Sequence, residues 1–166
     1  MEKQRPAYKA FTPDQKYNCW VDKLEEVKSL EWTEKEFTHI ALLAETMKLE
    51  WFEDNFRKTN FDQIDNFLKK WVDDGYSYFG WTKDEVGRIV ACLKEVAMED
   101  GNVVLKVAVG GSAEAGGKPA CTCSLESDWC GGGDRCKNIP CEGHPFCGTL
   151  WLYYCDGRCN DSAYNY

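Results

Sequence analysis

The sequence predicts a mainly α protein in two parts, an N-terminal four-helix bundle followed by a small disulfide-rich C-terminal module of loops and short strands. Helix-start motifs and amphipathic stripes fill residues 12–101, whereas eight of the ten cysteines lie within 39 residues near the C-terminus. A chain of 166 residues is long enough for one small domain and a mini-domain that buries too little apolar surface to fold without cross-links.

Three capping boxes mark the predicted helix starts. Each begins with a threonine, Thr12, Thr33 or Thr82, and has a glutamine or glutamate three residues later. In this motif the two side chains satisfy backbone N–H groups of the first turn. Pro13 stands at the first helical position of the first motif, where its missing N–H removes no hydrogen bond.

Apolar residues at helical spacing define the faces on which these helices pack. We expect the third helix to end before Gly75 and the fourth near Gly101, and we expect His39 at the surface or at the edge of the core. The four stripes are Tyr17, Trp20, Val21, Leu24 and Val27; Phe37, Ile40, Ala44, Met47 and Trp51; Ile64, Phe67, Leu68 and Trp71; and Val86, Ile89, Val90, Leu93 and Ala97.

The stretch between the two parts predicts one strand and a linker. Residues 103–109 are β-branched and apolar, whereas residues 110–118 are small, Gly-rich and poor in groups that pack. We therefore expect a polar tail over 1–11, the helical bundle over 12–101, a short strand and Gly-rich linker over 102–118, and the disulfide-rich module over 119–166.

Either disulfides or bound zinc could staple the cysteine-rich segment. The spacing contains no C-x2-C pair, the usual mark of a structural zinc site, and His144 is the only histidine nearby. Disulfides are favoured, with zinc or a reduced, redox-active array as alternatives. Because disulfides persist in oxidising compartments, we expect a secreted or extracytoplasmic protein with no metal and no cofactor. The cysteines are Cys121, Cys123, Cys130, Cys136, Cys141, Cys147, Cys155 and Cys159.

Two further cysteines, Cys19 and Cys92, lie on the first and fourth predicted helices. A disulfide between them would tie the ends of the bundle together, and two free buried thiols are the alternative. Redox chemistry at this pair is the least favoured interpretation.

The N-terminal residues carry no recognisable export signal. Residues 1–10 are polar and charged and lack the apolar stretch of a signal peptide, and no later run approaches transmembrane length. Because the cysteines indicate export, we expect this chain to be the mature form, with its signal peptide removed and Met1 added for expression.

Three stretches of the cysteine-rich segment form a distinctive pattern: Cys121-Thr-Cys123-Ser124, Ser127-Asp128-Trp129-Cys130, and Cys147-Gly148-Thr149 with Trp151 and Tyr153. Over about residues 120–160 the pattern resembles fulvocin C, a small eight-cysteine bacteriocin, and the longer fulvocin C-related proteins that carry such a module at their C-terminus. In those relatives a helical region with a KYN-x-W stretch precedes the module, and residues 16–20 look like that stretch. The last two cysteines are spaced more widely than in the bacteriocin, so no disulfide pairing is carried over.

The resemblance implies a bacteriocin-like role in competition between bacteria. The stapled module would be the active part, and its partner a receptor or another cell-surface component of the target bacteria. The alternative is a non-toxic extracellular binding module that recognises a protein or a glycan. We expect no enzyme, because the sequence shows no nucleophile with a base, no motif of paired carboxylates and no phosphate loop.

Charge and aromatic residues narrow the choice of partner. The chain's net charge of −8 disfavours nucleic acid, and residues 118–166 carry four basic and six acidic residues, a net charge of −2 that disfavours attraction to anionic lipid. The candidate contact surface is aromatic, because so small a module is not expected to bury all of its aromatic side chains. The alternative is a miniature core over the disulfides. The residues are Trp129, Phe146, Trp151, Tyr153 and Tyr154.

Overall fold

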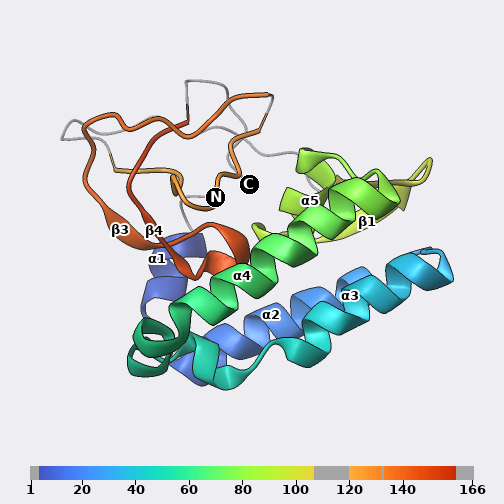
Figure 1. Ribbon diagram of the computed structural model, residues 1–166, viewed down its shortest axis with the longest axis horizontal. Coiled ribbons are helices and arrows are strands. Elements are labelled where there is room, and N and C mark those ends of the chain that lie inside the picture. The colour runs from blue at the N-terminus through green and yellow to red at the C-terminus, as the bar shows by residue number, and fades with distance from the viewer. Residues whose placement is uncertain (1–3, 107–119, 132, 160–166) are drawn as a thin grey trace.

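The computed structural model describes residues 4–106, 120–131 and 133–159, and about half of the chain is helical. The described residues form the helices α1 (Gln4–Lys9), α2 (Pro13–Lys28), α3 (Glu34–Thr46), α4 (Asp54–Phe79) and α5 (Lys83–Val90), with a 3-10 turn η1 (Leu49–Phe52). Strands β1 (Val96–Glu99) and β2 (Asn102–Leu105) pair in one antiparallel hairpin, and β3 (His144–Cys147) and β4 (Tyr153–Cys155) in another that encloses the 3-10 turn η2 (Thr149–Trp151). The disulfide module, defined here as residues 120–159, lies beside α1 and α4 (Figure 1).

All three predicted capping boxes form, and α2, α3 and α5 begin at them. At the start of α2 the hydroxyl of Thr12 accepts a hydrogen bond from the Gln15 N–H at 3.3 Å, and the Gln15 side chain accepts one from the Thr12 N–H at 2.9 Å. The same reciprocal bonds start the other two helices. These starts depend on neighbours in sequence alone, which is why the sequence predicts them correctly.

The end of α4 differs from the prediction. The helix continues through Gly75 and ends at Gly80, whose φ of +70° is the left-handed conformation that glycine adopts freely. A Cβ atom at Gly75 would lie 2.9 Å from Cε3 of Trp81. Gly75 is therefore required for the close approach of the Trp81 ring, not for stopping the helix.

The predicted fourth helix is also too long. Helix α5 ends at Val90, and residues 96–105 form the β1–β2 hairpin. At its turn Asp100 and Gly101 have φ values of +49° and +78°, the pair of left-handed residues that a two-residue hairpin turn needs. Of the strand predicted over 103–109, only residues up to 105 belong to β2; residues 107–109 and the linker at 110–118 lie outside the described residues.

The predicted four-helix bundle is not confirmed. Helices α2, α3 and α4 pack together, but α5 has only eight residues and the stripe residue Trp51 belongs to η1. In the predicted polar tail, residues 4–9 form α1, whose Tyr8 is only 2% exposed. The stripe residue Phe37 is 45% exposed and lies outside the core.

The hydrophobic core runs without interruption from the helices into the disulfide module. Its largest side chains from the helices include Trp20 and Trp71, and Trp151 enters from the module. The indole N–H of Trp71 donates to the backbone oxygen of His39 at 2.8 Å within this core. The His39 ring stacks on Trp71 at 4.6 Å and is buried, so of its two expected positions the surface is wrong. Burial lowers its pKa.

The continuous core predicts that the helices and the module unfold together. Trp151→Ala should lower the free energy of unfolding by about 3–5 kcal/mol, the usual cost of removing a buried tryptophan, and the loss should appear in both parts of the chain. Chemical denaturation followed by circular dichroism and by tryptophan fluorescence would measure it. Tyr154→Ala, at a side chain that is 57% exposed, is the control and should cost far less. Two separate transitions would contradict a shared core.

Candidate functional site

Four disulfides cross-link the module, as the sequence predicts. They join Cys121 to Cys141, Cys123 to Cys136, Cys130 to Cys159 and Cys147 to Cys155. Such cross-linking fits an extracellular protein. No helix among the described residues has both the length and the apolar composition needed to cross a bilayer.

The possible fifth disulfide between Cys19 and Cys92 does not form. Both residues are described and both are free thiols, with Cys19 half-buried on α2 and Cys92 buried. Because α5 ends at Val90, Cys92 lies beyond the helix, where its sulfur accepts a hydrogen bond from the Lys94 N–H at 3.4 Å. The alternative of free thiols is the one that the structure shows.

An unusual backbone path presents the module to the helices. Phe146 in β3, and Gly148, Leu150 and Trp151 between β3 and β4, have φ values of +82°, +71°, +52° and +54°. Left-handed conformations are uncommon for residues other than glycine. Here they turn the loop so that Leu150, Trp151 and Leu152 all become buried.

Trp151 is the centre of the contact between the two parts. Its ring packs edge-on against Tyr8 of α1 at 4.9 Å and Trp20 of α2 at 5.9 Å. Its indole N–H donates to the backbone oxygen of Ala91, just after α5, at 3.0 Å. One side chain of the module thus joins three helical segments, and it is only 1% exposed.

Tyr153 makes a second contact, with α4. Its ring packs edge-on against Phe61 at 5.4 Å, and its hydroxyl donates to Oδ1 of Asp65 at 2.8 Å. The other carboxylate oxygen of Asp65 accepts a hydrogen bond from Lys69 at 2.7 Å. Burial raises the pKa of the Tyr153 hydroxyl, and the hydrogen bond to Asp65 raises that pKa further.

Trp129 is held inside the module by a short hydrogen-bond network. Its indole N–H donates to Oγ1 of Thr149 at 3.1 Å, and the Thr149 N–H donates to Oγ of Ser127 at 2.9 Å. Trp129 is 9% exposed. The tryptophan and its two partners come from two of the stretches that carry the family resemblance, so these residues form one structural unit.

The structure corrects the predicted aromatic contact surface. Trp129, Trp151 and Tyr153 are buried, and Phe146 is half-buried with the Lys16 ammonium 4.5 Å from its ring centre. Only Tyr154, at 57%, is exposed. The helices supply the cover that the module alone lacks, so most of these aromatic residues serve the core.

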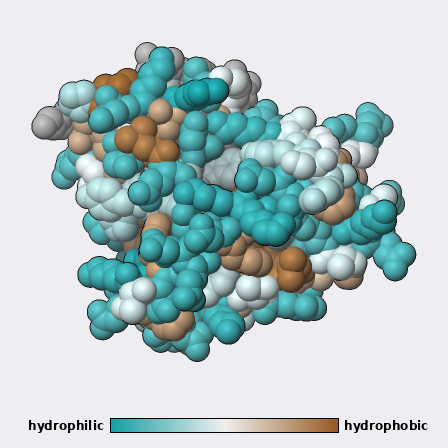
Figure 2. All heavy atoms as spheres, viewed as in Figure 1, coloured by the Kyte–Doolittle hydropathy of each residue, from teal (hydrophilic) through white to brown (hydrophobic). Residues whose placement is uncertain are grey.

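The exposed apolar side chains of the module lie elsewhere. Leu125 is 43% exposed and Ile139 is 39% exposed; together with Tyr154 they make up what we call the module apolar surface. Figure 2 shows hydrophobic residues exposed on the module, at the upper left. Leu125 and Ile139 are single exposed apolar residues in loops between cysteines, and that pattern is too weak to find from sequence.

Described residues line a crevice and a groove. A crevice of about 140 Å³ lies between α4 and the module, with Asp73, Glu126 and Asp128 in its wall. Beside it, burial and the charges of Asp73 and Asp128 raise the pKa of Tyr76 to about 12. A groove of about 830 Å³ lies between the start of α3 and the end of α4, where Tyr78 is 77% exposed. The sequence predicted neither.

Comparison of the chain with protein-family models, with curated proteins and with solved structures found no match. Its function is therefore proposed from its own residues and their arrangement.

The disulfide pattern predicts the mass change on reduction. Each disulfide takes up two protons and two electrons, so full reduction of the four bonds should raise the intact mass by about 8 Da. In denaturant without a reductant, iodoacetamide should modify Cys19 and Cys92 alone. Mass spectrometry of the intact and digested chain measures both, and a rise of about 10 Da would instead show that these two cysteines also pair.

The buried tyrosines predict loss of stability at alkaline pH. Burial raises the pKa of Tyr8 and of Tyr153 above the value of about 10 in unfolded chains. Above that pH the unfolded chain loses these protons while the folded chain keeps them, so the free energy of unfolding should fall as pH rises, by about 1.4 kcal/mol per pH unit for each tyrosine.

Urea denaturation at several pH values between about 9 and 11 tests this. In Tyr153→Phe the free energy of unfolding should fall less steeply with pH, because the contribution of one tyrosine is removed. Tyr78→Phe, at an exposed ring on α4, is the matched control and should leave the slope unchanged. An unaltered slope in Tyr153→Phe would contradict the assignment.

Proposed function

We propose that this chain is a secreted, bacteriocin-like protein of interbacterial competition, in which the helices hold the disulfide module in a fixed orientation toward a component of the target cell surface. The observation that carries the proposal is the fulvocin C-like pattern of residues 121–124, 127–130 and 147–153, together with the KYN-x-W-like stretch at residues 16–20. The four disulfides of the module support an extracellular site of action.

Contacts between the motif stretches support a likeness that extends over the whole chain. Trp20 of the helical stretch packs against Trp151 of the module at a ring distance of 5.9 Å. Tyr153 packs closely over Gly148, where a Cβ atom would lie 2.5 Å from the Tyr153 ring. Residues from separate stretches of the sequence pattern thus pack together in one structural unit, which explains why the stretches occur in the same chain.

The same contacts favour the full chain as the active unit. Cutting the module away would expose Leu150, Trp151 and Leu152, which are at most 5% exposed in the intact chain. Exposed apolar surface of that kind promotes aggregation. We therefore propose that the module acts while it is attached, and we amend the expectation that the module alone is the active part.

The module apolar surface is the proposed contact with the target. Leu125, Ile139 and Tyr154 are exposed on a segment whose net charge is negative, so attraction to anionic lipid does not favour binding. A specific receptor or surface polymer with a complementary apolar patch is the kind of partner that fits.

The groove between α3 and α4 favours a second candidate function, a non-toxic glycan-binding protein. Its wall combines the exposed ring of Tyr78 with polar groups of Glu34, Lys35 and Thr38. An exposed aromatic face with polar side chains around it is a surface on which a sugar ring can stack and form hydrogen bonds.

Growth inhibition by the oxidised full chain tests the proposed function. Over a panel of related bacteria the full chain should inhibit at least one strain, reduction should abolish the effect, and residues 119–166 alone should be weaker. Leu125→Asp and Ile139→Asp should each reduce inhibition without loss of fold, whereas Leu42→Asp, at an exposed leucine of α3, should not. A folded chain that binds cells or glycans and inhibits no strain would favour the second candidate.

A further inference from the structure

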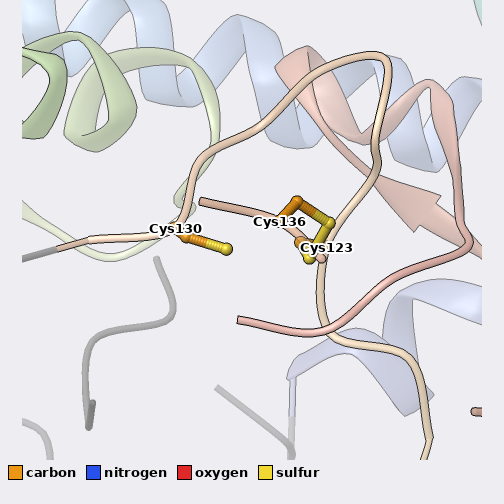
Figure 3. Close-up of side chains that lie close together, drawn as sticks. All are labelled: Cys123, Cys130 and Cys136. Carbon is orange, nitrogen blue, oxygen red and sulfur yellow. A yellow bond between two sulfur atoms is a disulfide. The ribbon is translucent and has the colours of Figure 1, made fainter. Parts of the chain in front are cut away.

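The sulfur atoms of two disulfides form one cluster in the module. The Sγ atoms of Cys123, Cys130 and Cys136 all lie within 4.8 Å of one another. Figure 3 shows the Cys130 side chain directed toward the Cys123–Cys136 bond. Cys130 is itself bonded to Cys159, whose sulfur therefore lies next to the cluster. Among residues 4–106, 120–131 and 133–159 this is the one group of three metal-ligating side chains at such distances.

Backbone hydrogen bonds hold the cluster together independently of its disulfides. Cys123 and Gly157 exchange two of them, each of 3.2 Å between N and O. Lys137, next to Cys136, and Arg158, next to Cys159, exchange two more, of 2.9 and 3.0 Å. Residues 157–158 thus tie the segment around Cys123 to the segment around Cys136.

Side chains accept hydrogen bonds from the backbone of the other two cysteines, Cys130 and Cys159. The Cys159 N–H donates to Oγ1 of Thr122 at 3.1 Å, and the Cys130 N–H donates to Oδ1 of Asp128 at 2.8 Å. Trp129, which precedes Cys130, is fixed by its hydrogen bond to Thr149. Cys123, Cys130 and Cys159 thus have backbone hydrogen bonds of their own, and Cys136 lies next to Lys137, which exchanges two with Arg158.

The chain also approaches the cluster closely. A Cβ atom at Gly157 would lie 2.6 Å from Sγ of Cys136, so only glycine leaves room for that sulfur. Three of the four basic residues in 118–166, namely Arg135, Lys137 and Arg158, are sequence neighbours of Cys136 or Cys159.

We propose that, when its two disulfides are reduced, this cluster becomes a four-thiolate site for a divalent cation such as zinc, with Cys123, Cys130, Cys136 and Cys159 as ligands. Tetrahedral zinc with Zn–S bonds of about 2.3 Å places its sulfurs about 3.8 Å apart. The three clustered sulfurs are thus already close to this spacing, and the Cys159 sulfur, once released from Cys130, would complete the set. Under reducing conditions, before the disulfides form, the metal would cross-link the module at these four cysteines. After oxidation the two disulfides cross-link it at the same place.

The chemical balance of the change is simple. Four molecules of a low-molecular-weight thiol reduce the two disulfides, forming four cysteine thiols and two molecules of its disulfide. Each S–S bond takes up two electrons and two protons. Binding of the cation then displaces the four thiol protons, so the affinity should rise with pH.

Cobalt(II) and zinc(II) binding to the full chain tests the proposal. The chain is first reduced with a phosphine in the absence of oxygen. One equivalent of Co²⁺ should then give the absorption bands of a tetrahedral thiolate site, and these bands should disappear when added Zn²⁺ displaces the Co²⁺. Alkylation with and without Zn²⁺, followed by mass spectrometry, should show metal-dependent protection of the four proposed ligands and of no other cysteine in the module.

Paired variants separate the site from general thiol binding. Cys130→Ser with Cys159→Ser should weaken Co²⁺ binding by at least roughly tenfold. Cys121→Ser with Cys141→Ser, which removes a disulfide outside the cluster, is the matched control and should keep the one-equivalent site. Absence of a tetrahedral cobalt spectrum, protection spread over all eight cysteines, or equal losses in both double variants would each overturn the proposal.

Discussion

The insertion of Trp151 into the helical region is the interaction on which the rest of the structure depends. Its ring contacts Tyr8 and Trp20, and its N–H bonds to Ala91, so that α1, α2 and the end of α5 all meet the module at one side chain. The loop that delivers it has Leu150 and Trp151 in left-handed conformations, which cost on the order of 1–3 kcal/mol each. Burial of several large apolar side chains offsets that cost, because each contributes about 1.5–3 kcal/mol.

Disulfides and hydrophobic burial act at different places in the module. The four disulfides restrict its loops, and Cys121, Cys147 and Cys155 form a small buried cluster of their own. They do not cover the aromatic residues that face the helices. That cover comes from α1, α2, α4 and α5, which turns a cross-linked segment into part of one continuous core.

This division has a consequence for function. A module joined to the helices by Trp151 and by the Tyr153–Asp65 hydrogen bond presents its outer side chains in a fixed orientation. A fixed orientation lowers the entropy cost of binding a partner. The conspicuous aromatic residues stabilise the fold, and the contact surface that we propose consists of less conspicuous exposed side chains such as Leu125 and Ile139.

The sequence by itself determined the features that depend on neighbouring residues. The capping boxes at Thr12, Thr33 and Thr82 located three helix starts, and the density of cysteines predicted the cross-linked module. Tertiary structure decided whatever depends on contacts between distant segments. Gly75 lies inside α4 because the Trp81 ring packs on it, and four predicted surface aromatics lie against or beneath other side chains. A helix cap is satisfied within one turn of chain, whereas burial of Trp151 requires residues more than a hundred positions away, and no local pattern records that.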